Sequence, residues 1–186
     1  MTISYTLTNI SANRYRYDYT VTNDGSLPGA AAVNWIYILF ASTPIDLQPD
    51  GIPDHTIYDN VAVAASPANW DVILQPPTLS FGGADGVLDA LALPGPGVAS
   101  GNSLGGFSVA FDWWGPGLPG AQPFAIWDLS ATTTLPPDCQ HSNPTGSDPI
   151  ACGMTQAAVP MPAGIWLFTS ALAGCGLLRR SSRVAP

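Results

Sequence analysis

The alternation of side chains over the first 22 residues constrains the fold more than any other feature of this sequence. Residues 2–8 (TISYTLT) alternate hydroxyl and apolar side chains, and residues 13–22 repeat the device after a short loop at residues 9–13. A period of two residues is typical of a half-buried β-strand, so the pattern predicts two strands joined as a hairpin. We expect the apolar row of the second strand to pack into a core, with a sugar-stacking face as the alternative: Tyr15, Tyr17, Tyr19 and Val21.

Glycine and proline, with 19 residues each, interrupt the rest of the chain too often for long helices. The runs between these breaks predict strands at residues 33–40, 57–64, 69–74, 87–93, 106–114 and 124–129, with a loop at residues 44–59. The run VNWIYILF at residues 33–40 is almost continuously apolar, as in a central strand covered on both faces. We therefore predict a mainly β protein. Residues 1–158 form one extracytoplasmic domain, an antiparallel β-sandwich of Ig-like or jelly-roll-like type with its strands within residues 2–130.

The charge of this predicted domain is strongly acidic. All 13 acidic residues are aspartates that precede residue 159, and the chain has neither glutamate nor lysine. The same part of the chain has only two cationic side chains, Arg14 and Arg16. Proteins that bind nucleic acid need basic patches, so nucleic acid is excluded as a partner. The charge suits a soluble extracellular protein whose molecules repel one another.

The C-terminal segment differs from everything before it. Residues 163–178 (AGIWLFTSALAGCGLL) contain no charged side chain. As a helix they would be about 24 Å long, and a hydrocarbon core of roughly 30 Å can thin to match them. Trp166 would lie near one interface, while Arg179, Arg180 and Arg183 would keep residues 179–186 in the cytoplasm. We predict a single transmembrane helix at residues 163–178; a buried core helix is the alternative.

The residues around this predicted helix resemble a known sorting signal. The stretch VPMPAGIWLFTSALAGCGLLRR begins with Val159, Pro160, Met161 and Pro162, and Met161 stands where the family has glutamate or leucine. It is similar to a PEP-CTERM signal, and closest to the variant written VPLPA. The shared landmarks are Trp166, Leu167, Phe168, Ser170, Gly174, Gly176 and Arg179–Arg180. The resemblance implies that an exosortase of a Gram-negative envelope cleaves the chain near residues 160–162. The product would then go to the cell surface or the extracellular matrix.

The body of the chain adds to this resemblance. Its stretches NWD at residues 69–71, LDALA at 88–92 and SLGGFSV at 103–109 look like those of many exosortase-sorted proteins. This likeness implies no activity. A sorting signal does presuppose export, yet the chain begins directly with a strand pattern and shows no basic or apolar leader region. We therefore expect a signal peptide upstream of Met1, which would then not be the natural start.

One loop offers candidate metal ligands. Asp46, Asp50 and Asp54 lie in the predicted loop at residues 44–59, and oxygen-rich loops can hold calcium. Only the step Asp50-Gly51 fits the pattern of an EF-hand, and the closing glutamate is missing. A solvated loop is the preferred interpretation. We predict neither a metal site nor a cofactor.

The three cysteines divide by context. Cys139 and Cys152 bracket a loop rich in proline, glycine and asparagine, and in an oxidising envelope they could close a disulfide worth about 3 kcal/mol. The alternative is a metal site built from these two thiols and His141, which lacks a fourth ligand at a recognised zinc spacing. Cys175 lies within the predicted membrane helix and is expected to stay reduced.

Motifs for catalysis are missing from the sequence. It has two histidines, His55 and His141, and no nucleophile elbow, zinc-protease motif or phosphate loop. The leading hypothesis is a non-enzymatic component of the cell envelope or extracellular matrix. A second hypothesis is a carbohydrate-binding module that would recognise surface polysaccharide. A third is a glycan-active hydrolase with two aspartates facing each other. The carbohydrate-binding module would use exposed indole rings as stacking platforms, chosen among Trp70, Trp113, Trp114 and Trp127.

Overall fold

The computed structural model describes residues 1–48, 50–76, 86–95, 97–128 and 149–158. Within these residues the chain is mainly β, as predicted, with one short 3-10 helix at Pro28–Ala30 (η1). The strands are β1 (Thr2–Ser11), β2 (Arg14–Thr22), β3 (Trp35–Phe40), β4 (Pro44–Ile45), β5 (His55–Thr56), β6 (Tyr58–Ala65), β7 (Trp70–Gln75), β8 (Gly86–Ala92), β9 (Ser103–Trp113), β10 (Pro123–Trp127), β11 (Ala151–Met154) and β12 (Gln156–Ala157).

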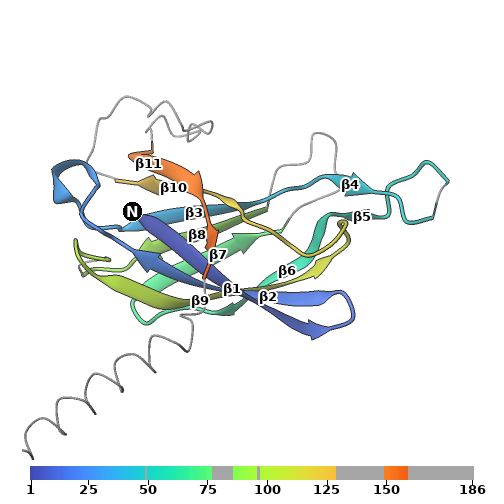
Figure 1. Cartoon of the computed structure of the whole chain (residues 1–186), viewed down its shortest axis with the longest axis horizontal. Coiled ribbons are helices and arrows are strands. Elements are labelled where there is room, and N and C mark those ends of the chain that lie inside the picture. The colour runs from blue at the N-terminus through green and yellow to red at the C-terminus, as the bar shows by residue number, and fades with distance from the viewer. Residues whose placement is uncertain (49, 77–85, 96, 129–148, 159–186) are drawn as a thin grey trace, which may run out of the picture.

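Most strands belong to two five-stranded sheets (Figure 1). The first sheet has the order β12-β1-β2-β9-β6, and the second has the order β11-β10-β3-β8-β7. Every pair of neighbours is antiparallel except β12 and β1, which are parallel. Residues from both sheets contribute to one hydrophobic cluster, which is the arrangement of a β-sandwich.

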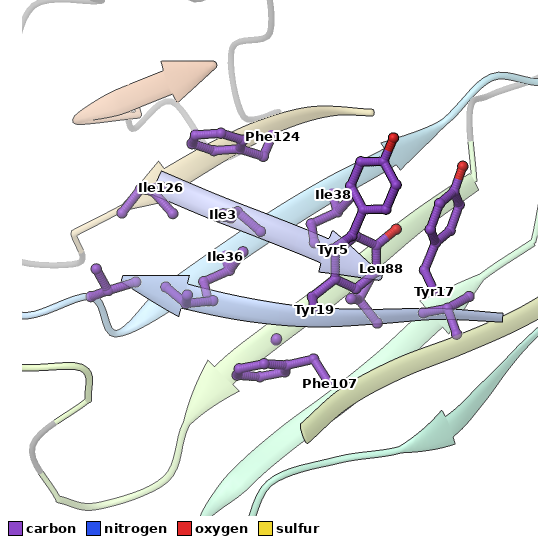
Figure 2. Packing of buried hydrophobic residues seen from close by; sticks show 14 of the residues in the cluster. Ile3, Tyr5, Tyr17, Tyr19, Ile36, Ile38, Leu88, Phe107, Phe124 and Ile126 are labelled. Carbon is purple, nitrogen blue, oxygen red and sulfur yellow. The ribbon is translucent and has the colours of Figure 1, made fainter. Parts of the chain in front are cut away.

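The predicted first hairpin is confirmed and supplies one side of this core. Ile3 and Tyr5 of β1 point inward beside Tyr17, Tyr19 and Val21 of β2, and all five are buried. Figure 2 shows Ile3, Tyr5, Tyr17 and Tyr19 against side chains of the second sheet, including Ile36, Ile38, Leu88, Phe124 and Ile126. The tyrosine row is therefore a core row, with no sugar-stacking role for Tyr17 and Tyr19. Full burial of a large apolar side chain stabilises a fold by about 1.5–3 kcal/mol, so the alternation of residues 2–22 specifies the orientation of the hairpin.

A hydrogen-bonded group of polar side chains lies within the core. The hydroxyl of Tyr19 donates to Oε1 of Gln122 at 3.1 Å, and Nε2 of Gln122 donates to the hydroxyl of Tyr58 at 3.2 Å. The backbone N–H of Gln122 donates to Oγ1 of Thr155 at 2.8 Å. Burial raises the pKa of Tyr19 well above its usual value, so its hydroxyl keeps its proton. Because Thr155 lies between β11 and β12, this group ties the last strands to the core.

Four short strands differ from the prediction. The predicted loop at residues 44–59 contains β4 and β5, which pair as a small separate sheet at its two ends. The sandwich also continues past residue 130, because β11 extends the second sheet and β12 extends the first. Strands of two to four residues are too short to show a period, which explains why the sequence did not reveal them. The central position of β3 between β8 and β10 is confirmed. The prediction that both faces of β3 are covered is not, because Trp35 and Tyr37 on one face are only half-buried.

The predicted C-terminal elements lie outside the described residues. These are the sorting motif at residues 159–162, the transmembrane helix at residues 163–178 and the basic tail at residues 179–186. Across the part of the chain that the structure does describe, no helix has the length and apolar character needed to cross a membrane.

Candidate functional site

The two outer faces of the sandwich carry different side chains. On the first sheet the outward residues of β2 are hydroxyl-bearing or charged, and both arginines of the domain lie there. Arg14 pairs with Asp112 of β9 at 3.0 Å, and Arg16 pairs with Asp18 at 3.0 Å. Ser108 also donates a hydrogen bond to Asp18. This face is a solvated surface whose charges are largely paired among themselves.

The outer face of the second sheet carries large aromatic side chains instead. Ile36, Ile38 and Phe40 of β3 point into the core, so Trp35 and Tyr37 must point outward. The register places Trp127 of β10 directly opposite Trp35, and Asp89 of β8 directly opposite Tyr37. Asp71 of β7 lies in the same row as Trp35, across Leu91. We call this set of five residues the aromatic face: Trp35, Tyr37, Asp71, Asp89 and Trp127.

The three rings of the aromatic face contact one another. The ring centroids of Trp35 lie 5.3 Å from Tyr37 and 5.7 Å from Trp127, and Tyr37 lies 5.5 Å from Trp127. The indole N–H of Trp35 donates to Oδ1 of Asp89 at 2.7 Å. Trp35 and Tyr37 are half-buried, whereas Trp127 is only 2% exposed. Its indole N–H has no hydrogen-bond partner among the described residues.

The carboxylate of Asp89 lies in an environment that disfavours its charge. Burial raises the pKa of Asp89, and the negative charge of Asp71 adds to this increase. The hydrogen bond from Trp35 acts in the opposite direction, because it stabilises the carboxylate. Burial and the neighbouring Asp89 also raise the pKa of Tyr37. The face therefore offers hydrogen-bond acceptors beside aromatic rings, a combination that suits a neutral ligand rich in hydroxyl groups.

The four tryptophans predicted as sugar platforms do not come together. Trp70 belongs to the core, where its ring lies edge-on to Phe107 at 5.0 Å. Trp113 and Trp114 are half-buried near the end of β9, and the indole N–H of Trp113 donates to the carbonyl of Gly117 at 2.9 Å. Only Trp127 lies on the aromatic face.

The sequence interpretation missed Trp35, Tyr37 and Asp89. Their signal was present within VNWIYILF, where Trp35 and Tyr37 alternate with Ile36 and Ile38. Because nearly every residue of that run is apolar, its period of two was hidden.

His55 forms a second polar cluster near β5. Its Nδ1 lies 2.7 Å from Oδ2 of Asp59, and its ring stacks on Trp114 with centroids 4.4 Å apart. A carboxylate in this position orients an imidazole, as in hydrolytic triads. The triad would also need a nucleophile hydrogen-bonded to the ring, and the described contacts of His55 include none. The cluster holds the start of β6 against the end of β9.

The side chains proposed as calcium ligands form hydrogen bonds within their own loop. The carboxylates of Asp46, Asp50 and Asp54 accept backbone N–H groups from Gly51, Ile52 and Gln48. Among the described residues, no group of three or more acidic, histidine or cysteine side chains is arranged to hold a metal ion. These hydrogen bonds fit the preferred interpretation of a solvated loop.

Cys152 lies on β11 and is disulfide-bonded. The other two cysteines, Cys139 and Cys175, lie outside the described residues, as does His141. The pairing of Cys139 with Cys152 therefore stays a prediction. A disulfide sulfur is not a thiolate, so Cys152 in this state does not provide the ligand that the alternative zinc site requires.

Comparison with protein-family models finds no match to this sequence, and comparison with curated proteins finds none either.

Proposed function

We propose that this chain is an exported, non-enzymatic component of the cell envelope or extracellular matrix, sorted and cleaved through its C-terminal segment. The observation that carries the proposal is the place where the sandwich ends. The last strand, β12, finishes at Ala157, and the backbone N–H of Ala158 still donates to Tyr5 at 2.7 Å. The proline-marked motif begins at the next residue, Val159. Cleavage near Pro160–Pro162 would therefore release a product that keeps every described strand.

The disulfide of Cys152 supports export. Disulfides form and persist in oxidising compartments such as the periplasm and the cell surface, and they are rare in the cytosol. A chain with a structural disulfide and a strongly acidic body fits an environment outside the inner membrane.

The C-terminal segment would have two separable roles. Residues 163–178, together with Arg179, Arg180 and Arg183, would hold the chain in the membrane with the arginines in the cytoplasm. Pro160 and Pro162 disfavour helix at and before their own positions, so the motif would remain extended and open to an exosortase.

Two variants of the chain separate these roles in a host that contains an exosortase, with a signal peptide fused before Met1. Replacing Pro160 and Pro162 with alanine should leave an unprocessed chain in the membrane fraction. Replacing the three tail arginines with serine should instead weaken membrane retention and orientation. Wild-type protein should appear at the surface as a shorter chain. Chains of one unprocessed size in wild type and both variants would contradict the sorting role.

The disulfide provides an independent test of export. Peptide mapping of protein recovered from the surface should find Cys139 joined to Cys152 and Cys175 reduced or absent. Two free loop thiols in that material would contradict an oxidising location for the domain.

A second candidate function, binding of a neutral surface glycan, rests on the aromatic face. Electrophoresis through gels containing the host's extracellular polysaccharide should retard the protein if this face binds sugar rings. Tyr37→Ala should abolish the retardation, whereas Tyr37→Phe should keep it, because stacking needs the ring and not the hydroxyl. Equal migration with and without polysaccharide would exclude this candidate.

A further inference from the structure

The two sheets end in four edge strands, and three of them are poor templates for pairing. β12 has two residues and β11 has four. β6 is longer, but its register against β9 shifts twice, and Asn60 within it has a positive φ of 46°. Short edges and bulged edges are the devices by which β proteins avoid pairing with other chains.

β7 is the exception among these edges. Its six residues (WDVILQ) pair with β8 in one unbroken register from Trp70 to Gln75. The strand contains neither proline nor glycine, and Asp71 is its only charge. Ile73, at its centre on the outer face, is 54% exposed. No described residue pairs with the other edge of β7. A regular, apolar, unpaired edge of this length presents backbone N–H and C=O groups that another strand can join.

The inner face of β7 packs against the hydrophobic core. Trp70 is buried in the core, while Val72 and Leu74 pack against it. Residues 66–69 connect β7 to β6, so the two edges lie on the same side of the sandwich, where β6 and β7 contact each other (Figure 1). Val63 of β6 is also exposed there, at 37%. An incoming strand would therefore meet an edge that is packed against the core on its inner face and flanked by apolar side chains.

We propose that β7 is a homodimerisation edge, which pairs antiparallel with β7 of a second copy about a two-fold axis at Ile73. This register places Ile73 opposite its own copy, Val72 opposite Leu74, and Asp71 opposite Gln75. Each carboxylate then faces a neutral amide that can donate a hydrogen bond to it, so this register avoids a contact between like charges. The second sheet of one copy then joins the second sheet of the other copy to form one continuous sheet. Such a contact is isologous and closed, so association stops at the dimer.

The charge of the protein sets how this dimer responds to salt. Each chain has a net charge of −8, so two copies repel each other over the whole surface. Ions screen that repulsion, whereas they leave the backbone hydrogen bonds and the apolar contacts at the edge largely unchanged. Dimerisation should therefore strengthen as salt increases.

The test is sedimentation velocity of the full chain in a non-ionic detergent, at low and high salt and at up to about 1 mM protein, a concentration that detects even weak dimers. The decisive variant is Ile73→Lys, which places two ammonium groups opposite each other at the axis and should weaken dimerisation roughly tenfold or more. The matched control is Ile10→Lys. It makes the same change on β1, where Ile10 is 52% exposed and far from this edge in the sheet order.

The proposal expects a wild-type dimer that strengthens with salt and an Ile10→Lys variant like wild type. It expects an Ile73→Lys variant that dimerises at least about tenfold more weakly, with an unchanged circular dichroism spectrum. Association through the C-terminal segment would persist in both variants, because both keep that segment. A wild type that stays monomeric under all conditions overturns the proposal. So does an Ile73→Lys variant that dimerises as strongly as Ile10→Lys.

Discussion

Asn23 offers the sharpest test of how this sandwich is held together. Its side chain is completely buried just after β2, where Nδ2 donates to the carbonyls of Ala31 and Val98, each at 2.9 Å. Its Oδ1 accepts the backbone N–H of Gly25 at 3.1 Å. One amide therefore links three separate backbone segments near the ends of both sheets.

Replacing Asn23 with alanine removes all three side-chain hydrogen bonds. The carbonyl of Val98 keeps a second donor, the N–H of Val33 at 2.9 Å. The groups left with no described partner are therefore Ala31 C=O and Gly25 N–H. Each lost hydrogen bond costs about 1 kcal/mol, and a group left unsatisfied in the interior costs somewhat more. We expect Asn23→Ala to lower the free energy of unfolding by about 3 kcal/mol. This leaves a domain of ordinary stability folded.

Asn23→Asp adds a pH dependence to this test. It keeps the acceptor for Gly25 but places a carboxylate oxygen against two carbonyl oxygens, which raises the pKa of the new group in the folded state. A raised pKa in the folded state means that stability falls as pH rises from about 3.9 through the folded value. The variant should thus be least stable at neutral pH and recover in acid.

Urea melts followed by tryptophan fluorescence measure both variants. The control is Asn9→Ala, because Asn9 is exposed and its one side-chain hydrogen bond, to the carbonyl of Ala12, is long at 3.4 Å. That change should stay within about 0.5 kcal/mol of wild type. An Asn23→Ala variant as stable as this control would refute the reasoning, as would an Asn23→Asp variant whose free energy of unfolding does not change with pH.

Two further changes test the packing and the aromatic face. Gly153→Ala places a Cβ 2.9 Å from the ring of Phe124 and should cost about 1–3 kcal/mol in a urea melt, whereas Gly120→Ala meets nothing within 4 Å and should be nearly neutral. Asp89→Asn keeps an acceptor for the indole N–H and removes a carboxylate whose pKa is raised by burial and by Asp71. The variant should therefore gain stability over wild type at neutral pH, and the gain should shrink as pH falls toward 3.8, where the aspartate itself becomes protonated. A constant difference across that range would contradict the assigned pKa shift.

A visible alternation of side chains predicted the first hairpin, whereas the other strands were predicted only as runs between glycine and proline breaks. Tyr17, Tyr19 and Val21 recur every second residue, and burial of that row makes a slipped register costly. The pairing of β2 with β9 could not be predicted, because 80 residues separate the two strands and no local pattern specifies which distant edge joins which. β11 and β12 are too short to carry a period, although they complete both sheets.

The candidate site was harder to predict than the fold. Tryptophan identity alone drew attention to Trp70, which the structure places in the core. The position of Trp35 depends on which face of β3 meets the other sheet, and an almost wholly apolar run does not reveal that. Asp89 becomes part of the site only through its register opposite Tyr37. Cross-strand register, a property of tertiary structure, therefore determines the aromatic face.

Export and sorting are tested most directly by the intact mass of the protein recovered from the surface of a host that contains an exosortase. The proposed function predicts a chain that keeps β12 and ends near Pro160–Pro162, without the apolar segment and the three C-terminal arginines. A surface product that still ends at Pro186 would contradict cleavage and leave the C-terminal segment as an anchor only.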